Sequence, residues 1–399
     1  MSERRRPNES LTDTPVDVAI VGGGPAGLCL AKALADSGLA LMVLEQNPSS
    51  ALANPQPDGK EIALTHASRA LLETLGIWSG LPSEAISCLK DAAVFDGESD
   101  QPMRITHADG GRDCLGWLVS NQFIKQSAYE AVADQPNLRI VNEVSVDRTS
   151  LTDRGRRVHL ADGRHVDARL VVAADSRFSN LRRVTGIGAR MRDFGQSMLL
   201  CRVHLEKDHE HVAWEWFGYD RTLALLPLND RMASVVITLP HEHIERLAGL
   251  DQAAFNKEVS GLYRHRLGKM TAVGERHLYP LVGVWPDRLV DERLAVLGDA
   301  AVGMHPVTAH GFNLGLKGVE LLSKQLIGAP PEQLAHPKRL AAYQRQLRLA
   351  SLPLYLATQT VVGLYSQNQW PVRILRRTML RLAGRMTPFR RAVARQLTG

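Results

Sequence analysis

A chain of 399 residues, 44% hydrophobic and 23% charged, has room for two or three domains with large cores, which excludes a disordered protein and a membrane-embedded helical bundle. The net charge of +6 is unevenly distributed, because residues 338–399 contain twelve Lys or Arg and no Asp or Glu. The other residues, 36 basic and 42 acidic, carry a net charge of −6. Since no helix-turn-helix, zinc-finger or RNP-type pattern accompanies the basic segment, we expect no nucleic-acid partner.

The first fifteen residues are polar, include three arginines and have no apolar stretch, so they predict a flexible N-terminal arm rather than a signal peptide. The four cysteines lie far apart, without the Cys-x-x-Cys spacing of a zinc knuckle or a redox pair. They are Cys29, Cys88, Cys114 and Cys201. We therefore expect no metal site and a reduced, cytoplasmic setting.

A nucleotide-binding fingerprint follows the arm. Residues Val16–Ile20 have the apolar pattern of a buried parallel strand, and helical periodicity begins soon after them. A Gly-x-Gly-x-x-Gly sequence separates the two, formed by Gly22, Gly24 and Gly27. The first glycine permits a tight turn, the second lets the backbone approach a pyrophosphate, and the third lets the helix pack closely on the strand. The pyrophosphate is expected at the helix N-terminus, where free N–H groups favour an anion.

A second apolar run, LALMVLE, ends at Glu45, eighteen residues after Gly27. The fingerprint places an acid at this point to bind a ribose. A glycine pattern alone would be weak evidence, but a glycine pattern between two strands with this acid predicts a Rossmann-type unit. The fingerprint does not separate NAD from FAD.

Two later segments favour flavin through their resemblance to a known family. Residues Arg169–Arg183 (RLVVAADSRFSNLRR) resemble the strand-turn motif of the single-component flavin aromatic hydroxylases, and the matching positions are Asp175, Ser179 and Arg182. Residues Arg293–Leu316 are similar to the second flavin motif of that family, and the matching positions are Gly298, Asp299, Pro306, Gly311 and Asn313. Asp299, at a strand end, can accept hydrogen bonds from ribityl hydroxyls, and the helix that follows Gly311 can stabilise negative charge on reduced flavin.

Within that family, the chain resembles the ubiquinone-biosynthesis FAD-dependent hydroxylases most, and among them the demethoxyubiquinol hydroxylase branch. The segments that carry this resemblance are Asp58–Trp78, Leu115–Val132 and Leu223–Asp230. Several positions depart from the family pattern, among them Lys60 and Lys125, which stand where flavin-contacting arginines are usual. A lysine keeps the positive charge but loses the planar bidentate fork of arginine.

The resemblance implies an FAD-dependent monooxygenase. NAD(P)H would bind transiently and reduce the flavin, O2 would be held as a hydroperoxide at ring carbon 4a, and a quinone-like ring, of the demethoxyubiquinol type, would be hydroxylated. His305 and His310 fall in the loop expected at the flavin ring, so each either orients a ring hydroxyl and moves a proton or is only bonded within the loop. The alternative is a flavoprotein reductase or a non-oxygenating, membrane-associated redox partner that binds FAD.

The expected architecture is α/β, with two interleaved domains and a tail. Residues 16–185 and 286–337 form the Rossmann-type FAD-binding domain in this interpretation, and residues 186–285 form a mostly antiparallel substrate domain. Residues 338–399 form a basic helical tail. Its arginines alternate with apolar residues at helical spacing, which favours a helix on an anionic membrane surface, so the protein would be peripheral on the inner face of the membrane. A basic helix packed on the acidic body is the alternative.

Overall fold

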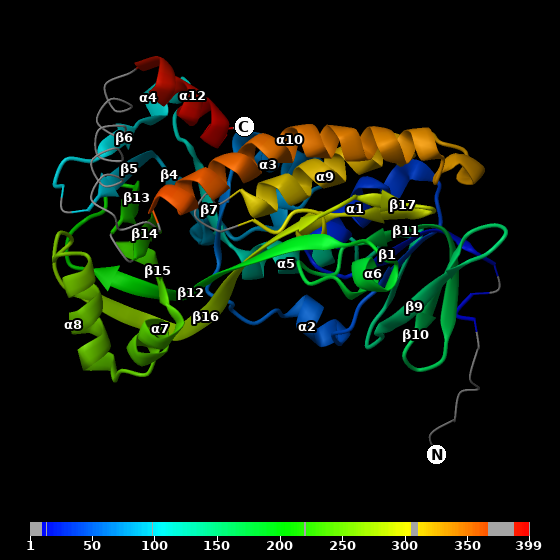
Figure 1. The fold of residues 1–399 in the computed structure, drawn as a ribbon, viewed down its shortest axis with the longest axis horizontal. Helices are drawn as coiled ribbons and strands as arrows, with labels where there is room; N and C mark the ends of the chain where they lie inside the picture. Colours follow the sequence, from blue (N-terminus) through cyan, green and yellow to red (C-terminus); the bar gives the residue numbers. More distant parts are fainter. Residues whose placement is uncertain are drawn as a thin grey trace.

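The computed structural model describes residues 10–12, 14–97, 99–218, 221–304, 310–365 and 387–398. His305 and Pro306, both predicted site residues, lie outside the described residues, as does most of the N-terminal arm. The predicted fold class is confirmed within the described ranges: a parallel Rossmann-type sheet, a mostly antiparallel second sheet and helices near the C-terminus (Figure 1).

The first sheet contains the strand of the nucleotide fingerprint. Its main path is β17 (Val290–Asp291), β18 (Leu294–Val296), β11 (His165–Ala173), β1 (Val16–Val21), β2 (Leu41–Leu44) and β8 (Leu138–Val141). Strands β1, β2, β8, β11 and β18 pair in parallel, and β9 (Val146–Leu151) and β10 (Arg156–Leu160) extend β11 as an antiparallel meander. Five of the six residues of β1 are apolar and buried, because a parallel sheet is covered on both faces.

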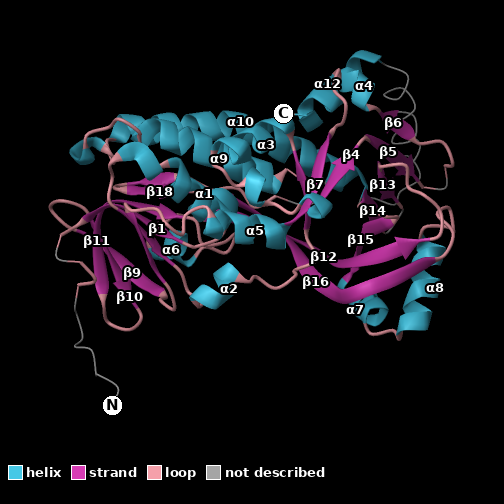
Figure 2. Ribbon diagram, turned by 180° about the vertical axis from the view of Figure 1, so that it is seen from behind, coloured by secondary structure: helices cyan, strands magenta, loops and turns pink. Residues whose placement is uncertain are grey.

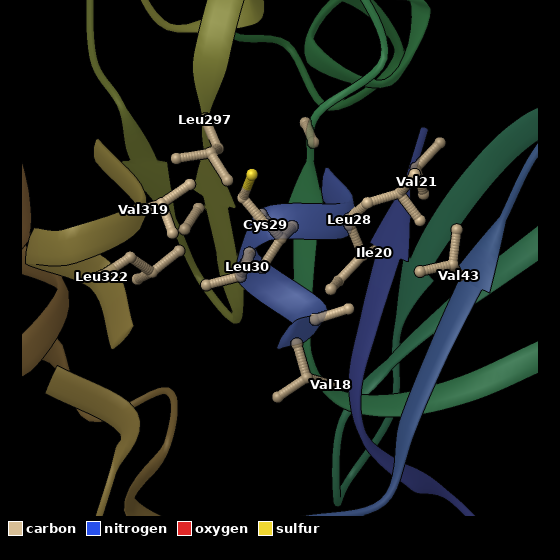
Figure 3. Packing of buried hydrophobic residues seen from close by; sticks show 14 of the residues in the cluster. Val18, Ile20, Val21, Leu28, Cys29, Leu30, Val43, Leu297, Val319 and Leu322 are labelled. Atoms are coloured by element: carbon tan, nitrogen blue, oxygen red, sulfur yellow. The ribbon is translucent and has the colours of Figure 1, made fainter. Parts of the chain in front are cut away.

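Helices α1 (Pro25–Ala33) and α9 (Gly311–Leu326) cover the centre of this sheet. Figure 3 shows the packing: Ile20 and Leu28 lie beside each other, and Leu297, which follows β18, and Val319 of α9 lie on the other side of α1. All of these side chains are buried. Helix α5 (Asn121–Glu130) and the short helices α2 (Ser49–Ala53) and α6 (Asn180–Val184) complete this half.

The second sheet has seven strands. Their order is β16 (Met270–Pro286), β12 (Ala189–Leu205), β15 (Met232–Pro240), β14 (Thr222–Pro227), β13 (Val212–Phe217), β5 (Asp91–Asp96) and β6 (Met103–Ile105). All pairings are antiparallel except that of β13 with β5. Helices α7 (His241–Ala248) and α8 (Gln252–Leu262) pack on its outer side (Figure 2). Residues 16–185, predicted from the sequence to form part of the FAD-binding domain, thus contribute β5 and β6 to the second sheet.

A small third sheet lies between the two halves. It is formed by β3 (Glu61–Leu64), β7 (Gly116–Ser120) and β4 (Ile86–Leu89), and α3 (His66–Thr74) follows β3. The side chain of Thr65 caps α3 by accepting a hydrogen bond from the Ser68 N–H at 3.2 Å. The long strands β12 and β16, 17 residues each, reach from the second sheet toward the first (Figures 1 and 2).

The basic tail forms two helices in its described part. Helix α10 (Pro337–Tyr365) packs along α9, and the Tyr343 hydroxyl donates to the Val296 carbonyl at 2.7 Å. Helix α12 (Thr387–Thr398) packs on β6 and on α4 (His107–Gly110), where Ala394 is buried with Ile105 and Leu115. Among the described residues, no helix is both long enough and apolar enough to span a bilayer.

Candidate active site

A cavity of about 490 Å³ lies between the nucleotide-binding half and the second sheet. One wall is built from the three flavin-type motifs, which contribute Gly24, Asp175 and Asp299. The opposite wall is the inner face of the second sheet, with side chains such as Leu200 and Val236. Residues as far apart in the chain as Gly24 and Leu316 therefore border one space.

The three fingerprint glycines have distinct surroundings. Gly22 has a φ of +112°, and a Cβ there would lie 2.4 Å from the Ala174 carbonyl oxygen. A Cβ on Gly27 would lie 2.1 Å from the Gly22 carbonyl oxygen, so α1 can approach β1 only with glycine at this position. A Cβ on Gly24 would meet nothing within 4 Å, because this residue borders the cavity at the start of α1. Only Gly24 thus offers open backbone to a ligand.

Glu45 lies at the end of β2, close to the first turn but outside the cavity lining. Its carboxylate accepts hydrogen bonds from the Gly23 N–H at 2.6 Å and from the Asn47 N–H at 2.9 Å. It is 6% exposed. The structure therefore places the acid beside the fingerprint, where a ribose-binding role stays a prediction.

The Asp175 motif is held by its own buried residues. The Ser179 hydroxyl caps α6 by accepting from the Arg182 N–H at 3.0 Å. The guanidinium of Arg182, 1% exposed, donates to the carbonyls of Arg177 at 3.2 Å and Ala300 at 2.9 Å. Ser179 and Arg182 therefore position the loop, while Asp175 borders the cavity.

The second motif meets the first at a glycine contact. Gly298 has a φ of +64°, and a Cβ on it would lie 2.9 Å from the Ala26 Cβ in α1. The next residue, Asp299, is exposed to the cavity and forms an ion pair with Arg177, Nη2 to Oδ2 at 3.5 Å. Sequence reasoning did not single out Arg177, although it stands within the quoted segment as a charged residue two positions after Asp175.

Three further predicted residues lie at the N-terminal end of α9. Gly311 is the first residue of α9 and borders the cavity. Asn313 instead ties α9 to β3, because its side chain accepts from the Thr65 N–H at 3.1 Å and donates to the Ala63 carbonyl at 2.8 Å. His310 lies at the N-cap of α9 and borders a separate pocket of about 250 Å³ rather than the large cavity. The structure does not bring His310 to the cavity wall.

Lys60 and Lys125 both border the cavity, on its polar side. Lys125 Nζ lies 2.9 Å from Asp58 Oδ2, which also accepts from Asn121 at 2.6 Å. Burial opposes ionisation of Asp58, but these partners together hold its pKa below the ordinary value. Lys60 Nζ lies 4.3 Å from the centre of the Tyr279 ring, and burial lowers its pKa.

The residues at this wall fit a flavin nucleotide. Helix α1 has no side-chain cap at its N-terminus, so its first N–H groups are available to a pyrophosphate. Asp175 Oδ1 is buried and accepts no hydrogen bond from the described residues, and a hydroxyl-bearing ligand would satisfy it. Gly24 leaves open space where a side chain would otherwise stand.

Comparison with known proteins identifies the family. The family model described as an FAD binding domain matches residues 15–351. The chain belongs to this FAD-binding family. It is 39% identical to ubiquinone hydroxylase UbiM of Neisseria meningitidis over 96% of this chain and 84% of the relative. It is 29% identical to 3-demethoxyubiquinol 3-hydroxylase of Escherichia coli, over 98% of this chain and all of the relative.

The fold of this family member also resembles solved structures. The structure of p-nitrophenol 4-monooxygenase PnpA from Pseudomonas putida has a TM-score of 0.79 at 18% identity, covering 97% of this chain and 99% of that one. The predictions of an FAD-dependent monooxygenase, of FAD as cofactor and of NAD(P)H as co-substrate are confirmed. The roles of single residues at the flavin remain predictions.

Proposed function

We propose that this FAD-dependent monooxygenase hydroxylates the aromatic ring of a ubiquinone-biosynthesis intermediate, using NAD(P)H and O2. The observation that carries the proposal is the composition of the cavity, which has the nucleotide-binding motifs on one wall and a largely apolar sheet face on the other. A cavity of about 490 Å³ suits a ring-sized ligand beside a cofactor. The 39% identity to a ubiquinone hydroxylase supports the choice of ring.

The protein's own residues would bind and orient both partners. The open backbone at Gly24 and the first turn of α1 would hold the pyrophosphate, and Asp299 and Asp175 would accept hydrogen bonds from hydroxyls of the cofactor. Met198 and Leu200 of the sheet face would pack on the substrate ring and exclude water. When bound, the flavin supplies hydride acceptance and activation of dioxygen.

The ring position follows less directly from the relatives. The resemblance to the demethoxyubiquinol hydroxylase branch predicts hydroxylation at the position that this branch uses. Identity is higher to UbiM, 39%, than to 3-demethoxyubiquinol 3-hydroxylase, 29%. We therefore propose the ring class on the relatives together and keep the demethoxyubiquinol-type ring as the first substrate to test.

The test is incorporation of oxygen into a ring substrate. Purified protein loaded with FAD is supplied with NADPH or NADH, ¹⁸O2 and a short-chain demethoxyubiquinol, and the products are analysed by mass spectrometry. The expected product gains one ¹⁸O atom per molecule. If NAD(P)H is consumed while the substrate is recovered unlabelled and only hydrogen peroxide or a reduced substrate forms, the reductase alternative replaces this proposal.

We further infer that the chain binds a membrane surface through its basic tail. Helix α12 exposes Arg391 and Arg395, and α10 exposes Leu349, Leu352 and Leu356 at helical spacing. The packing of α12 on the body, with Arg390 3.5 Å from Asp109, occupies one side of the helix and leaves these arginines exposed to solvent. A substrate that resides in the bilayer would reach an enzyme resting on the surface, so a peripheral location on the inner face fits the proposed reaction.

A further inference from the structure

Glu215 stands on a cavity wall that otherwise presents apolar or hydroxyl side chains. It lies in the middle of β13. The strand register puts it in one row across the sheet with Ala224 of β14, Val236 of β15 and Leu200 of β12. All four residues border the cavity. The other side chains of the second sheet that border it are Met198, Thr222, Leu226, Ser234 and Thr238. Glu215 is therefore the one ionisable group that the described part of this sheet contributes to the cavity.

Strand β13 is held firmly on both sides of Glu215. The neighbouring Trp214 and Trp216 point to the opposite face, because side chains alternate along a strand, and both pack on the Phe95 ring with centroids 5.3 Å away. Trp216 Nε1 also donates to the Gly97 carbonyl at 2.9 Å. The strand therefore aims the carboxyl of Glu215 at the cavity rather than at solvent.

No described residue hydrogen-bonds the Glu215 carboxyl. Burial raises its pKa to about 8. The nearby Tyr263 hydroxyl instead donates to the Ala224 carbonyl at 2.6 Å. Glu215 is only partly buried, so its carboxyl is accessible from the cavity, where a ligand is the natural partner.

We propose that Glu215 contacts the ring substrate, hydrogen-bonding a ring hydroxyl and accepting its proton as the ring is attacked. This inference rests on the proposed ring hydroxylation. The O–H bond of the substrate breaks, a new O–H bond forms on the carboxylate, and the electron pair stays on the ring oxygen. The ring becomes more electron-rich and thus more reactive toward an electrophilic oxygen. When the ring becomes aromatic again, the attacked carbon releases its proton to solvent, and the carboxyl returns its proton to the ring oxygen.

The other charged groups of the cavity lie on elements other than β13, and burial alone accounts for the raised pKa of Glu215. The ionisable residues that border the same cavity from other elements are Lys60, Glu61, Lys125, Asp175, Arg177 and Asp299. Glu61 is engaged by Arg202, Oε1 to Nη2 at 2.7 Å, and Asp299 by Arg177. On the strands that flank Glu215, the paired residues Val94 and Ala224 are uncharged. An acid titrating near the working pH suits proton exchange with a ring hydroxyl.

Ligand binding tests the contact without turnover. The FAD-loaded protein is titrated by calorimetry with 4-methoxyphenol and with 1,4-dimethoxybenzene, which differ in one ring hydroxyl. The wild type should bind the phenol about ten-fold or more tightly, as expected for a hydrogen bond to an ionisable group. Glu215→Ala should lose this preference while retaining FAD. The matched control is Glu275→Gln on the exposed face of β16, which should bind as the wild type does.

Turnover tests the proton transfer. With the quinol substrate, Glu215→Gln should lower kcat about 10²-fold or more with a smaller change in KM, and Glu215→Asp should recover part of kcat. An unchanged phenol preference in Glu215→Ala, or an unchanged kcat in Glu215→Gln, would overturn the assignment. If the wild type forms no hydroxylated product, the proposed function fails. The binding experiment still tests Glu215 in that case. A wild type that shows no preference for the phenol would reject the contact as well.

Discussion

Arg182 donates a hydrogen bond from Nη1 to the carbonyl oxygen of Ala300 at 2.9 Å, although the two residues lie 118 positions apart in the chain. The bond joins the loop of Asp175 to the loop of Asp299, so these two cavity-lining acids share one buried support. The same guanidinium donates to the Arg177 carbonyl at 3.2 Å. A residue that matches the family motif thus acts on the cofactor wall through backbone carbonyls rather than by direct contact.

Replacing Arg182 with Met should destabilise the protein and weaken FAD binding together. The carbonyls of Ala300 and Arg177 would lose a donor, which lowers the free energy of unfolding by about 1–3 kcal/mol. Urea denaturation measures the stability, and fluorescence titration measures the dissociation constant of FAD. The control Arg183→Met alters an exposed neighbour and should change neither. Unchanged FAD affinity in Arg182→Met would show that the two loops hold their positions without this support.

Substitutions of the first and third fingerprint glycines should destabilise the fold, whereas substitution of the second should abolish FAD binding without destabilising it. Gly24→Val should leave the stability of the apoprotein within about 1 kcal/mol, because the backbone at Gly24 is extended and no atom lies within 4 Å of the new Cβ. It should lose FAD, since the side chain would fill the space left for the ligand. Gly27→Ala should lose stability as well, because its Cβ would lie 2.1 Å from a carbonyl oxygen. A Gly24→Val protein that purifies yellow with full flavin content would reject the proposed pyrophosphate site.

Local patterns in the sequence were enough to predict the Rossmann-type half. The apolar run of β1, the glycine turn and the acid at the end of β2 are contiguous, so spacing alone fixes their arrangement. The roles of Gly22 and Gly27 follow from steric rules that act over a few residues. The pairing of β5 with β13 is different, because it joins residues more than a hundred positions apart and nothing local encodes it.

Two cavity residues, Arg177 and Glu215, were not predicted from the sequence, because their surroundings also depend on contacts between distant parts of the chain. Arg177 is adjacent to matched positions, but its ion pair with Asp299 depends on how two distant loops meet. Glu215 carried a readable signal: it stands between two tryptophans on a strand, so alternation places it on the face opposite two large apolar side chains. That this face borders a cavity follows only from the packing of the second sheet against the flavin half.

Titration of Glu215 should make the free energy of unfolding depend on pH. Because the pKa of Glu215 is raised to about 8 in the folded protein, the folded state holds a proton that the unfolded state releases near the ordinary value of 4.5. The stabilisation is full below that value and is lost as pH rises toward about 8. The difference in unfolding free energy between the wild type and Glu215→Gln should therefore decline from pH 5 to pH 8 and then level off. Urea denaturation at several pH values tests this, and a constant difference would mean that Glu215 does not titrate in this range.

Membrane binding by the tail is best tested by charge reversal rather than by deletion. Ala394 of α12 is buried against Ile105 and Leu115, so removal of residues 387–398 would uncover apolar surface and confuse loss of binding with loss of packing. Arg391 and Arg395 are exposed on the same helix and can be changed without touching that contact. The double variant Arg391→Glu, Arg395→Glu should lose only a little unfolding free energy, because both residues are exposed and solvent screens the attraction of Arg391 to Asp109.

We expect the wild-type protein to sediment with vesicles of phosphatidylglycerol and phosphatidylcholine, and to bind them less as salt concentration rises, because the attraction between arginines and lipid phosphates is screened. The double variant should bind at least about ten-fold more weakly, since each basic residue near an anionic surface contributes about 1 kcal/mol. A variant with Arg148→Glu and Arg154→Glu changes the same charge on exposed residues of the β9–β10 hairpin and should bind as the wild type does. Equal loss in both variants would indicate attraction by net charge alone, and wild-type binding by the α12 variant would place the membrane contact elsewhere on the molecule.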